Sequence, residues 1–515
     1  MPRYKHYSYE QGKFIPIHFE AQILPGTFEH ALNHIVDHEL DMSVFETRYR
    51  NEETGAPAYD PKILLKIVLY AYSRGIFTSR DIESMCQQNV MFMALAADTR
   101  PHFTTIAEFI SAMGEVIKPL FRDVVMYCDE LGLIGKEMFA IDGCKITSNA
   151  SKEWSGTRED FEKKVKKYEE LIEKILSKHR EADEREEQEE QREKEAKAVE
   201  GMKKKVEKIK GWLAEYEEKR GKSKKELKQS MTDKESGKMP SSHGVIQGYN
   251  GIVAVDGKHQ VIVHAEANGE GPEQGMLEKM VKGVEETFEE MGEEKIYEKA
   301  KVLADSGFQS EENMKMLEER GIDGYIPDRG FRKRDERFEG AKEKHKRIEE
   351  YQGKVQEKKG LFQPKDFVFN PETGKLECPA GKPLYRQGKI TTRNGYSGYG
   401  YHARITDCRG CPLRAKCLRN PETPARQVYK FYERNGGQSY TKRMIEKLET
   451  PTGRFLYSLR MGIVEPVFAH IRYALGLDRF TLRGKKKVDA QWKLYGMVHN
   501  ILKAYRYGWQ AAGSG

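Results

Sequence analysis

The chain has 515 residues, and at roughly 150 residues per domain this length predicts about three globular units. Lys and Arg number 88 against 81 Asp and Glu, which gives a net charge of +7, and only 38% of the residues are hydrophobic. The length excludes a peptide hormone, and the absence of any run of about 18 apolar residues excludes a membrane transporter. The first residues show no secretory signal, so we expect a cytoplasmic protein whose seven cysteines are reduced.

Residues 19–131 are predicted to be mostly helical. Pro61 stands at the predicted start of a helix that contains ILLKIVLYAYSRG, and Thr78 or Ser79 can cap the next short helix. The segment TTIAEFISAMGEVIKPLF is predicted as a further amphipathic helix. Successive short helices are typical of helix-turn-helix DNA-binding proteins, although any small helical bundle gives the same pattern.

A block of mixed charge extends from Arg158 to Lys228. Two series of apolar residues within it step by three or four positions, one starting at Val165 and one at Val199. This pattern predicts two long helices folded back as an antiparallel hairpin. A single solvated helix or a partly disordered charged run is the alternative.

The sequence on both sides of this block favours an α/β layer. MFAID predicts a first strand, and VIQGYNGIVAVDGKHQVIVHAEA predicts two more that are joined at Asp256-Gly257. A helix from Gln274 to Met291, the strand KVLAD, a helix and the strand DGYIP follow. We therefore expect a mixed sheet that the helical hairpin interrupts after its first strand.

Asp142 and Asp305 each follow an apolar run, in AIDG and LADSG. Each carboxylate would emerge at the end of a buried strand, and neighbouring strand ends would bring the two together. Because two adjacent carboxylates repel, a cation such as Mg²⁺ or Mn²⁺ is expected to compensate them. The alternative is that each Asp serves as an ordinary turn or helix cap, as Asp256 does in its Asp-Gly turn.

A third acid is available in RFLYSLRMGIVEPVFAHIRYALGL, where Glu465 lies within an apolar helical run. Arg460 and Arg472 are the nearest cations along the chain. These Arg residues could bind phosphates beside a metal-bound Glu465, or they could form a structural salt bridge with it. The residues alone favour the salt bridge.

Four of the cysteines form a cluster in ECPAGKPL and DCRGCPLRAKC: Cys378, Cys408, Cys411 and Cys417. Their spacing favours a structural tetrahedral Zn²⁺ site. Reduced structural cysteines, an iron-sulfur cluster or a redox pair are the alternatives. The segment also contains several Arg and Lys residues and could lie against a phosphate backbone.

The last basic stretch, DRFTLRGKKKVDAQWKLYGMVHNILKAYRYGW, interleaves cations with Trp492, Tyr495, Tyr505 and Trp509. This combination suits a nucleic acid, by phosphate neutralisation and base stacking. An amphipathic helix with a positive solvent face and an aromatic core is the alternative.

The acids in IDGCKITSNAS, VLADSGFQSEEN and YSLRMGIVEPVFAHIR resemble those of the DDE transposases of bacterial insertion sequences, in the group of insertion sequence number eleven eighty-two. PKILLKIVLYAYSRGIFTSRDIE, RPHFTTIAEF and CRGCPLRAKC are also similar to that group, so the resemblance covers most of the chain. It implies a DDE triad on Asp142, Asp305 and Glu465. In related groups the Glu belongs to a Tyr-Arg-Glu-Lys signature, for which this sequence offers Tyr457, Arg460, Glu465 and Arg472, with four residues rather than three between Arg460 and Glu465 and with Arg in place of Lys.

The resemblance further implies an α/β chain with an RNase H-like mixed-sheet catalytic core, an all-α N-terminal DNA-binding region, the inserted hairpin and a small Cys-rich zinc-type loop. The expected boundaries are 1–135 for the helical DNA-binding and dimerisation region, 136–157 and 232–345 for the first part of the core, 158–231 for the hairpin, 346–435 for the Cys-rich insertion, and 436–512 for the C-terminal helices.

The activity implied by the resemblance is cleavage and strand transfer at the terminal inverted repeats of an element, with two Mg²⁺ or Mn²⁺ ions held by the triad and a structural Zn²⁺ elsewhere. The expected partners are double-stranded DNA, from the element ends and the target, and a second copy of the chain in the bacterial nucleoid. The expected DNA contacts are Tyr457, Arg460, Arg472, Arg483, Lys485, Lys486 and Lys487. Two rival functions remain: a zinc-stabilised DNA-binding protein with vestigial acids, and a structural coiled-coil protein.

Overall fold

The structure is a computed structural model that describes residues 16–48, 57–182, 189–218, 220, 226–241, 244–335, 360–393, 396–431 and 439–509. The chain divides into two compact units. The first comprises Met1–Phe308, Gly321–Gly324 and Phe455–Gly515, and the second comprises Gln309–Arg320 and Tyr325–Arg454.

The first unit begins with short helices whose ends follow the local sequence signals. Pro61 opens α2, where the Asp60 side chain accepts a hydrogen bond from the backbone N–H of Lys62 at 2.8 Å. Thr78 caps α3 by accepting from the N–H of Asp81, as predicted. The helices are α1 (Phe28–His34), α2 (Pro61–Ser73), α3 (Ser79–Gln88), α4 (Val90–Leu95), α5 (Phe103–Ala112) and α6 (Ile117–Glu130).

The segment predicted as one helix after Pro101 is two helices. A 3₁₀ turn at Met113–Glu115 separates α5 from α6. A β-carbon added at Gly114 would lie 2.7 Å from Cγ of Lys486, so the chain bends where the C-terminal part of the protein approaches it closely. Only the tertiary packing reveals this break.

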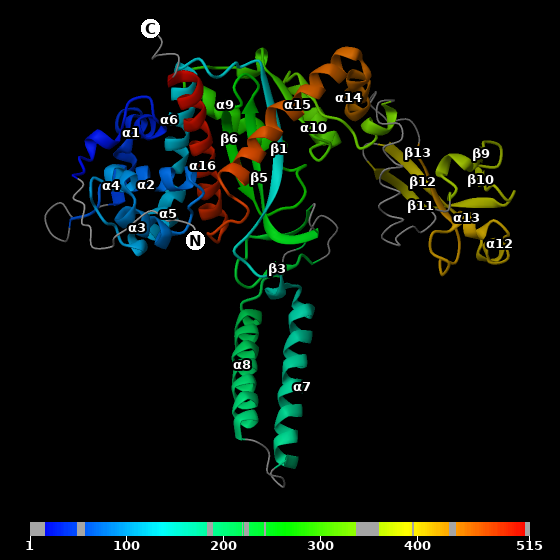
Figure 1. Cartoon of the computed structure of the whole chain (residues 1–515). Coiled ribbons are helices and arrows are strands. Elements are labelled where there is room, and N and C mark those ends of the chain that lie inside the picture. The colour runs from blue at the N-terminus through cyan, green and yellow to red at the C-terminus, as the bar shows by residue number, and fades with distance from the viewer. Residues whose placement is uncertain are drawn as a thin grey trace, which may run out of the picture. The chain divides into compact units, whose positions relative to one another are not determined.

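A mixed sheet forms the centre of the first unit (Figure 1). Its strands lie in the order β4-β5-β1-β7-β8, and β6 also pairs with β5. β1 runs antiparallel to β5 and parallel to β7. The strands are β1 (Met138–Thr147), β4 (Gly237–Ser241), β5 (Gly244–Asp256), β6 (Ile262–Asn268), β7 (Lys301–Ala304) and β8 (Gly324–Tyr325). The predicted strands are confirmed, and β4, whose sequence GKMPS lacks an alternating pattern, is an addition.

Helices cover both faces of this sheet. On one face, Phe288 of α9 (Leu277–Glu290) contacts Phe139, with ring centroids 5.6 Å apart. On the other, α16 (Lys485–Lys503) lies over Gly251, and the indole N–H of Trp492 donates to the carbonyl of Ile252 at 3.1 Å.

The N-terminal helices pack on the opposite side of α16. Tyr72 of α2 stacks on Tyr495 with ring centroids 4.6 Å apart, and the Cys128 thiol of α6 donates to the Asn500 carbonyl. A single buried helix therefore joins the helical region to the sheet. None of the helices in the described part of the chain combines the length and apolar character that a bilayer crossing requires.

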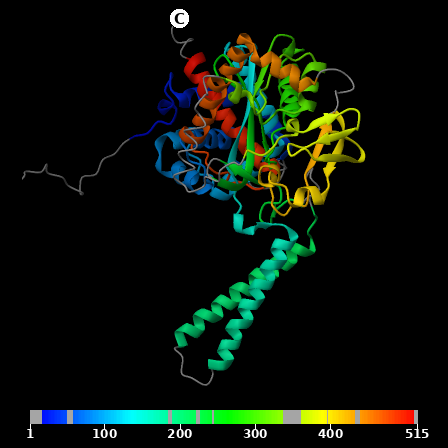
Figure 2. The ribbon, with the colours of Figure 1, turned by 90° about the vertical axis from the view of Figure 1, so that its right-hand side faces the viewer.

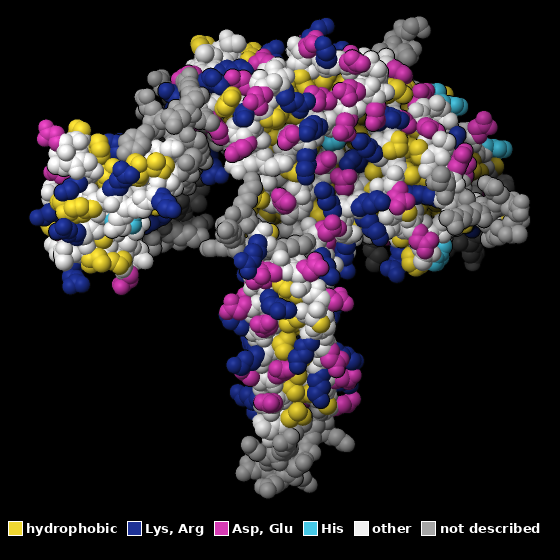
Figure 3. Space-filling view, turned by 180° about the vertical axis from the view of Figure 1, so that it is seen from behind, with side chains coloured by type: hydrophobic (Ala, Val, Ile, Leu, Met, Phe, Trp, Pro, Cys, Tyr) yellow, Lys and Arg dark blue, Asp and Glu magenta, His cyan; other side chains and the backbone are white. Residues whose placement is uncertain are grey.

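The charged block forms two helices, α7 (Arg158–Ala182) and α8 (Glu189–Ala214), which run side by side (Figure 1, Figure 2). A short antiparallel ladder joins β2 (Ser155–Gly156), which precedes α7, to β3 (Gln229–Ser230), which follows α8. One apolar cluster, built on Phe161, Val165, Val206 and Ile209, holds them together at this end. On the face seen in Figure 3, side chains of both charges flank a line of hydrophobic side chains along the two helices. The expected helical pair is confirmed, and residues 183–188 of its turn lie outside the described residues.

The second unit contains a five-stranded antiparallel sheet in the order β13-β12-β11-β10-β9. Its strands are β9 (Val368–Asn370), β10 (Lys375–Glu377), β11 (Pro383–Arg393), β12 (Tyr396–Ala403) and β13 (Gln427–Phe431). Phe367, Leu376, Leu384, Tyr401 and Val428 form its core. The unit also contains α10 (Glu311–Glu319), α12 (Ile405–Arg409), α13 (Arg414–Cys417) and α14 (Tyr440–Glu449). The sequence predicts only a small Cys-rich loop here, which is wrong about the architecture, because the short polar strands carry too little hydrophobic pattern to be recognised.

Candidate active site

The sheet brings Asp142 and Asp305 to neighbouring positions. Ile141 of β1 is paired with Ala304 of the parallel strand β7, and each Asp is the next residue. The apolar residues before both acids are fully buried, which anchors the two backbones. Asp305 lies at a strand end, as predicted. Asp142 does not, because β1 continues to Thr147 along β5, where β7 has already ended.

The Asp142 carboxylate accepts hydrogen bonds from its own strand, β1, and from α15 (Pro451–Ala469). Its Oδ1 accepts from the N–H of Gly143 at 2.8 Å, and its Oδ2 accepts from Nη1 of Arg460 at 2.5 Å. Burial raises the pKa of the Asp142 carboxyl group, the Arg460 guanidinium lowers it, and the negative charge of Asp305 raises it again. The net direction is upward, as expected for an acid that shares a partly buried site with another acid.

A third carboxylate, that of Glu273, approaches Asp305 from the loop between β6 and α9. Its Oε1 accepts a hydrogen bond from Nδ2 of Asn250 at 2.9 Å. A β-carbon added at Gly307 would lie 2.8 Å from Oδ1 of Asp305 and would collide with Oε2 of Glu273. The Gly307 N–H donates to Oδ1 of Asp305 at 2.6 Å. The same glycine therefore lies next to the carboxylates of both Asp305 and Glu273.

The electrostatics of Glu273 connect it to both aspartates. Burial raises the pKa of the Glu273 carboxyl group, the hydrogen bond from Asn250 lowers it, and the charges of Asp305 and Asp142 raise it. Sequence reasoning missed Glu273, because it stands in the loop EGPEQG, five residues after the end of β6 and not directly after an apolar run as the two aspartates do. No periodic pattern marks it, and only the folded sheet brings this loop to the aspartates.

Glu465 and Arg460 lie on different sides of α15. Arg460 of this helix is buried and faces Asp142, and Glu465 follows five residues later, about 140° further around an α-helix. Val464 and Val467 face the core, whereas Glu465 is exposed. Among the described residues, no hydrogen bond or ion pair joins Glu465 to Asp142 or Asp305. The structure therefore brings together two of the three predicted acids.

The other predicted DNA contacts occupy varied environments. Arg460 is 6% exposed and lies near the Tyr457 ring. The Arg472 guanidinium lowers the pKa of the Cys144 thiol, which burial nevertheless raises to about 12. Nε of Arg483 donates to the Asn149 carbonyl at 2.7 Å.

The three consecutive lysines lie at the start of α16. The Lys485 N–H donates to Glu235, Nζ of Lys486 is 3.0 Å from Glu115, and Lys487 is exposed. The aromatic residues that follow are different: Trp492 and Tyr495 are 1% and 0% exposed. The idea that these two rings stack on bases is wrong, because the sheet and the N-terminal helices enclose them.

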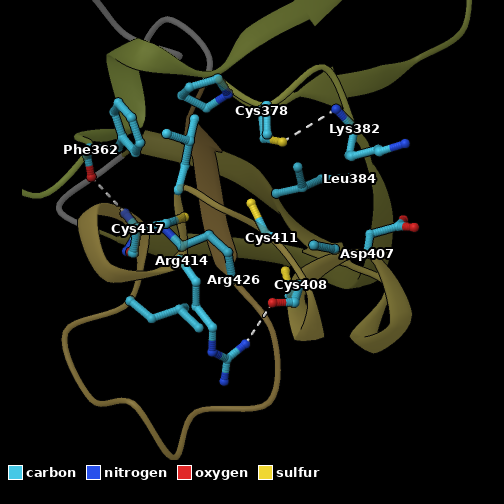
Figure 4. Close-up of a pocket in the computed structure, with 15 residues that line it drawn as sticks. Phe362, Cys378, Lys382, Leu384, Asp407, Cys408, Cys411, Arg414, Cys417 and Arg426 are labelled. Atoms are coloured by element: carbon cyan, nitrogen blue, oxygen red, sulfur yellow. Dashed lines mark hydrogen bonds between the residues drawn. The ribbon is translucent and has the colours of Figure 1, made fainter.

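The four clustered cysteines line one cavity in the second unit (Figure 4). The Lys382 N–H donates to Sγ of Cys378 at 3.3 Å, and Nη1 of Arg414 donates to the Cys408 carbonyl at 2.9 Å. Burial raises the pKa of the Cys417 thiol, Arg426 lowers it, and the three other clustered cysteines raise it. Residues far apart in the sequence thus surround one space, as the spacing predicts.

Neither group of residues is arranged as a finished coordination shell. Within the described ranges, no three His, Cys, Asp or Glu side chains lie close enough together to hold a metal ion. Two features near the acids nevertheless fit a hard cation. Because Gly143 and Gly307 have no side chains, oxygen atoms of Asn250 and Glu273 can lie close to the backbone that follows the two aspartates, and among the described residues Oδ1 of the buried Asn250 has no hydrogen-bond partner.

Two family models match the chain. Residues 377–505 match the family described as transposase DDE domain, and residues 17–112 match the transposase domain DUF772. The first match contains Glu465, Arg460 and the four clustered cysteines, and the second contains most of the N-terminal helices, whereas Asp142 and Asp305 lie between the two. No curated protein matches the chain. Both matches support a DDE transposase, a class of enzyme that generally uses divalent metal ions.

Proposed function

We propose that this protein is a DNA transposase of the group of insertion sequence number eleven eighty-two. It binds the terminal inverted repeats of its element and catalyses metal-dependent strand cleavage and strand transfer. One observation carries the proposal: Asp142 and Asp305 follow directly paired residues of adjacent parallel strands, in a chain that matches transposase families on both sides of them.

The proposed catalytic core is RNase H-like. The mixed sheet supports this assignment, because β1 lies between an antiparallel and a parallel neighbour and carries the first acid. The helical insertion follows β1 and leaves the pairing of β1 with β5 intact, since residues from Phe139 to Thr147 remain in register with β5.

The proposed chemistry is in-line displacement at phosphorus. Two Mg²⁺ or Mn²⁺ ions, when bound, would activate the attacking oxygen and stabilise the leaving oxygen. Asp142 and Asp305 would supply carboxylate ligands, and the resemblance assigns Glu465 as a third, which stays a prediction. Arg460 offsets the negative charge of Asp142 and offers the planar donor geometry that suits a phosphate group.

DNA binding is proposed for the N-terminal helices and for the basic start of α16. Arg483 and the lysines at 485–487 lie on this stretch, and Arg483, Lys486 and Lys487 are exposed. Tyr457 and Arg472 are proposed as further contacts near the acids. A homodimer is proposed because a two-fold assembly can hold both ends of an element at once.

The cysteine cavity is proposed to hold one structural Zn²⁺. Four thiols from β10–β11 and from the segment of α12 and α13 face one space, and four thiolates are a common ligand set for structural zinc. The metal would fix the segment Cys408–Cys417 against the five-stranded sheet.

The activity is tested by incubating the purified full chain with Mg²⁺ and DNA that carries the ends of its element. We expect nicks at one fixed position relative to the ends, followed by joining to a target duplex. DNA with scrambled ends serves as the control and should remain uncut. End-specific binding without any Mg²⁺-dependent or Mn²⁺-dependent cleavage would contradict the proposal and favour a DNA-binding protein with vestigial acids.

A further inference from the structure

We propose that Glu273 is a carboxylate ligand of the divalent cation site, beside Asp305, and that the Asn250 side-chain oxygen faces the same site. This inference rests on the proposed function only for the use of the cation. The position of Glu273 stands on its contacts alone.

Two glycines allow Glu273 to reach the aspartates. A β-carbon on Gly143, the residue after Asp142, would lie 3.1 Å from Oε1 of Glu273, and a β-carbon on Gly307 would collide with Oε2. The two oxygens of one carboxylate therefore lie against the backbone that follows each aspartate. A larger residue at either glycine would push the Glu273 carboxylate out of this position.

The side chain of Asn250 supplies an independent sign of a ligand. Asn250 is 1% exposed, and its Nδ2 orients Glu273. Its Oδ1 would lie 2.7 Å from a β-carbon on Gly143, close to Oε1 of Glu273, and it accepts no hydrogen bond within the described part of the chain. A buried amide oxygen without a donor is costly, and a hard cation prefers oxygen ligands of this kind.

The alternative role of Glu273 is to pair with a cation of the protein. Lys145 lowers the pKa of the Glu273 carboxyl group, but it is the last and smallest of the influences on this group. No ion pair of Glu273 occurs among the described residues, whereas Asp142 is paired with Arg460. The Glu273 carboxylate and Asp305 are therefore left to share one charge-compensating partner, which a divalent cation provides.

The test is direct titration of the full chain with Mn²⁺, followed by the electron paramagnetic resonance signal of the free ion. Glu273→Gln keeps the size of the side chain and its hydrogen bond from Asn250 but removes the charge. We expect Mn²⁺ affinity to fall by about tenfold or more. Glu270→Gln is the matched control, because Glu270 is an exposed acid of the same loop, and it should bind Mn²⁺ as the unmodified chain does.

A second variant tests the same position without removing a carboxylate, in case Glu273→Gln does not fold. Gly307→Ala retains every carboxylate and places a methyl group between Glu273 and Asp305, so it should weaken Mn²⁺ binding as well. Unchanged affinity in either folded variant overturns the inference, as does an unmodified chain that binds no Mn²⁺. A loss confined to Glu465→Gln would assign the third ligand to α15 instead.

The same proteins separate this inference from the proposed function. Glu273-dependent Mn²⁺ binding by a chain that cuts no element-end DNA would support the ligand and contradict the transposase. Specific cleavage by the unmodified chain, with Glu273→Gln equal to it in Mn²⁺ affinity, would support the transposase and contradict the ligand.

Discussion

Asp142 lies between a cation and an acid. The Arg460 guanidinium binds one of its oxygens, and Asp305 follows the paired residue on the neighbouring strand. Arg460 is buried and belongs to the same helix as Glu465, so this helix contributes charge compensation to the site, although among the described residues the exposed Glu465 forms no hydrogen bond or ion pair with either aspartate. The charge balance of the site thus depends on a residue that is predicted from the sequence to contact DNA.

We expect Asp142→Asn and Asp305→Asn each to abolish cleavage of element-end DNA while leaving DNA binding largely intact. In the proposed function these carboxylates hold the cation and do not bind the duplex, so the cleavage rate should fall by about a thousandfold or more. Cleavage rates and gel-shift affinities of the same preparations check this. Substantial Mg²⁺-dependent cleavage by a purified variant would remove that residue from the site.

The variant Glu465→Gln tests whether Glu465 is the third catalytic acid, as the family resemblance implies. If Glu465 is the third acid, its cleavage rate should fall as far as that of the aspartate variants. A rate close to that of the unmodified chain would mean that α15 contributes Arg460 but no ligand. Thermal unfolding should be unaffected in either case, since Glu465 is exposed.

His470 and His499 form a second buried polar group. Their Nδ1 atoms are 2.9 Å apart, and Nε2 of His499 is 2.9 Å from the carbonyl of Gln260. This arrangement needs a neutral His499 ring, which donates to the Gln260 carbonyl from Nε2 and accepts from Nδ1 of His470. Burial and the nearby Arg506 and Lys503 lower the pKa of His470 to about 4, and burial and His470 lower that of His499 to about 3.

The histidine pair should make folding sensitive to acid. The unfolded chain takes up these protons near pH 6.5 and the folded chain only below about 4, so the stabilisation is complete above pH 6.5 and is lost as the pH falls toward 4. We expect His499→Gln to lower the free energy of unfolding at pH 7 by roughly 2 kcal/mol and to flatten its dependence between pH 6.5 and 4.5. Denaturant titrations at several pH values measure this, and the exposed His18→Gln should keep the original dependence.

At the scale of elements, α7 and α8 form a separate apolar seam. Phe161, Val165 and Ile209 are buried within it, while Leu171 and Leu176 further along α7 are 40% and 37% exposed. The seam is anchored beside β2 and β3 rather than in the central sheet. We therefore propose that the hairpin is an addition to the fold, and that its outer faces contact a second chain or DNA.

We expect replacement of residues 158–228 by a short Gly/Ser linker to leave the rest of the chain folded and to impair the pairing of two element ends. The sheet pairs β1 with β5 without any hairpin residue, so its stability should change little. Circular dichroism, thermal unfolding and a paired-end gel-shift assay check the two parts. A deletion protein that does not fold would show that the hairpin belongs to the core.

The sheet of the second unit is small, and its apolar core contains few buried side chains. Cys378 and Cys417 pack against this core and also line the cysteine cavity. A metal held there would stabilise a unit that has little hydrophobic surface to bury.

We expect the chain purified without chelator to hold about one Zn²⁺, with metal–sulfur distances near 2.3 Å. Cys408→Ser together with Cys411→Ser should release the metal and lower the unfolding temperature. Lys416→Ala, which changes an exposed residue of the same segment, is the control and should retain the metal. Metal analysis and X-ray absorption measure both quantities, and four freely reactive thiols without zinc would refute the site.

At the scale of the whole molecule, the net charge of +7 conceals an uneven distribution. The helix α9 carries more acids than lysines, α7 and α8 carry both charges in similar numbers, and the chain from Arg472 to Arg506 is distinctly basic. Since α16 also carries the N-terminal helices on one side and the sheet on the other, its basic start is fixed to both regions.

We expect DNA affinity to fall by orders of magnitude between about 50 and 200 mM salt if six or more phosphates are neutralised. Changing Lys485, Lys486 and Lys487 together to Ala should flatten this dependence, although Lys486 also loses its ion pair with Glu115. Binding isotherms at several salt concentrations provide the slope. A salt-independent affinity, or an unchanged slope in the triple variant, would exclude this stretch from the DNA-binding surface.

Features that depend on a few neighbouring residues are predictable from the sequence alone. The caps of α2 and α3, the helical pair of the charged block, the strand that precedes each Asp and the clustering of four cysteines all follow from spacing and periodicity. The remaining features depend on how distant segments pack together. The approach of Glu273 to Asp305, the pairing of Arg460 with Asp142 and the burial of Trp492 depend on strand register, on close contacts at glycines and on which helix face meets the sheet. These are relations between distant segments, and no local pattern of side chains encodes them.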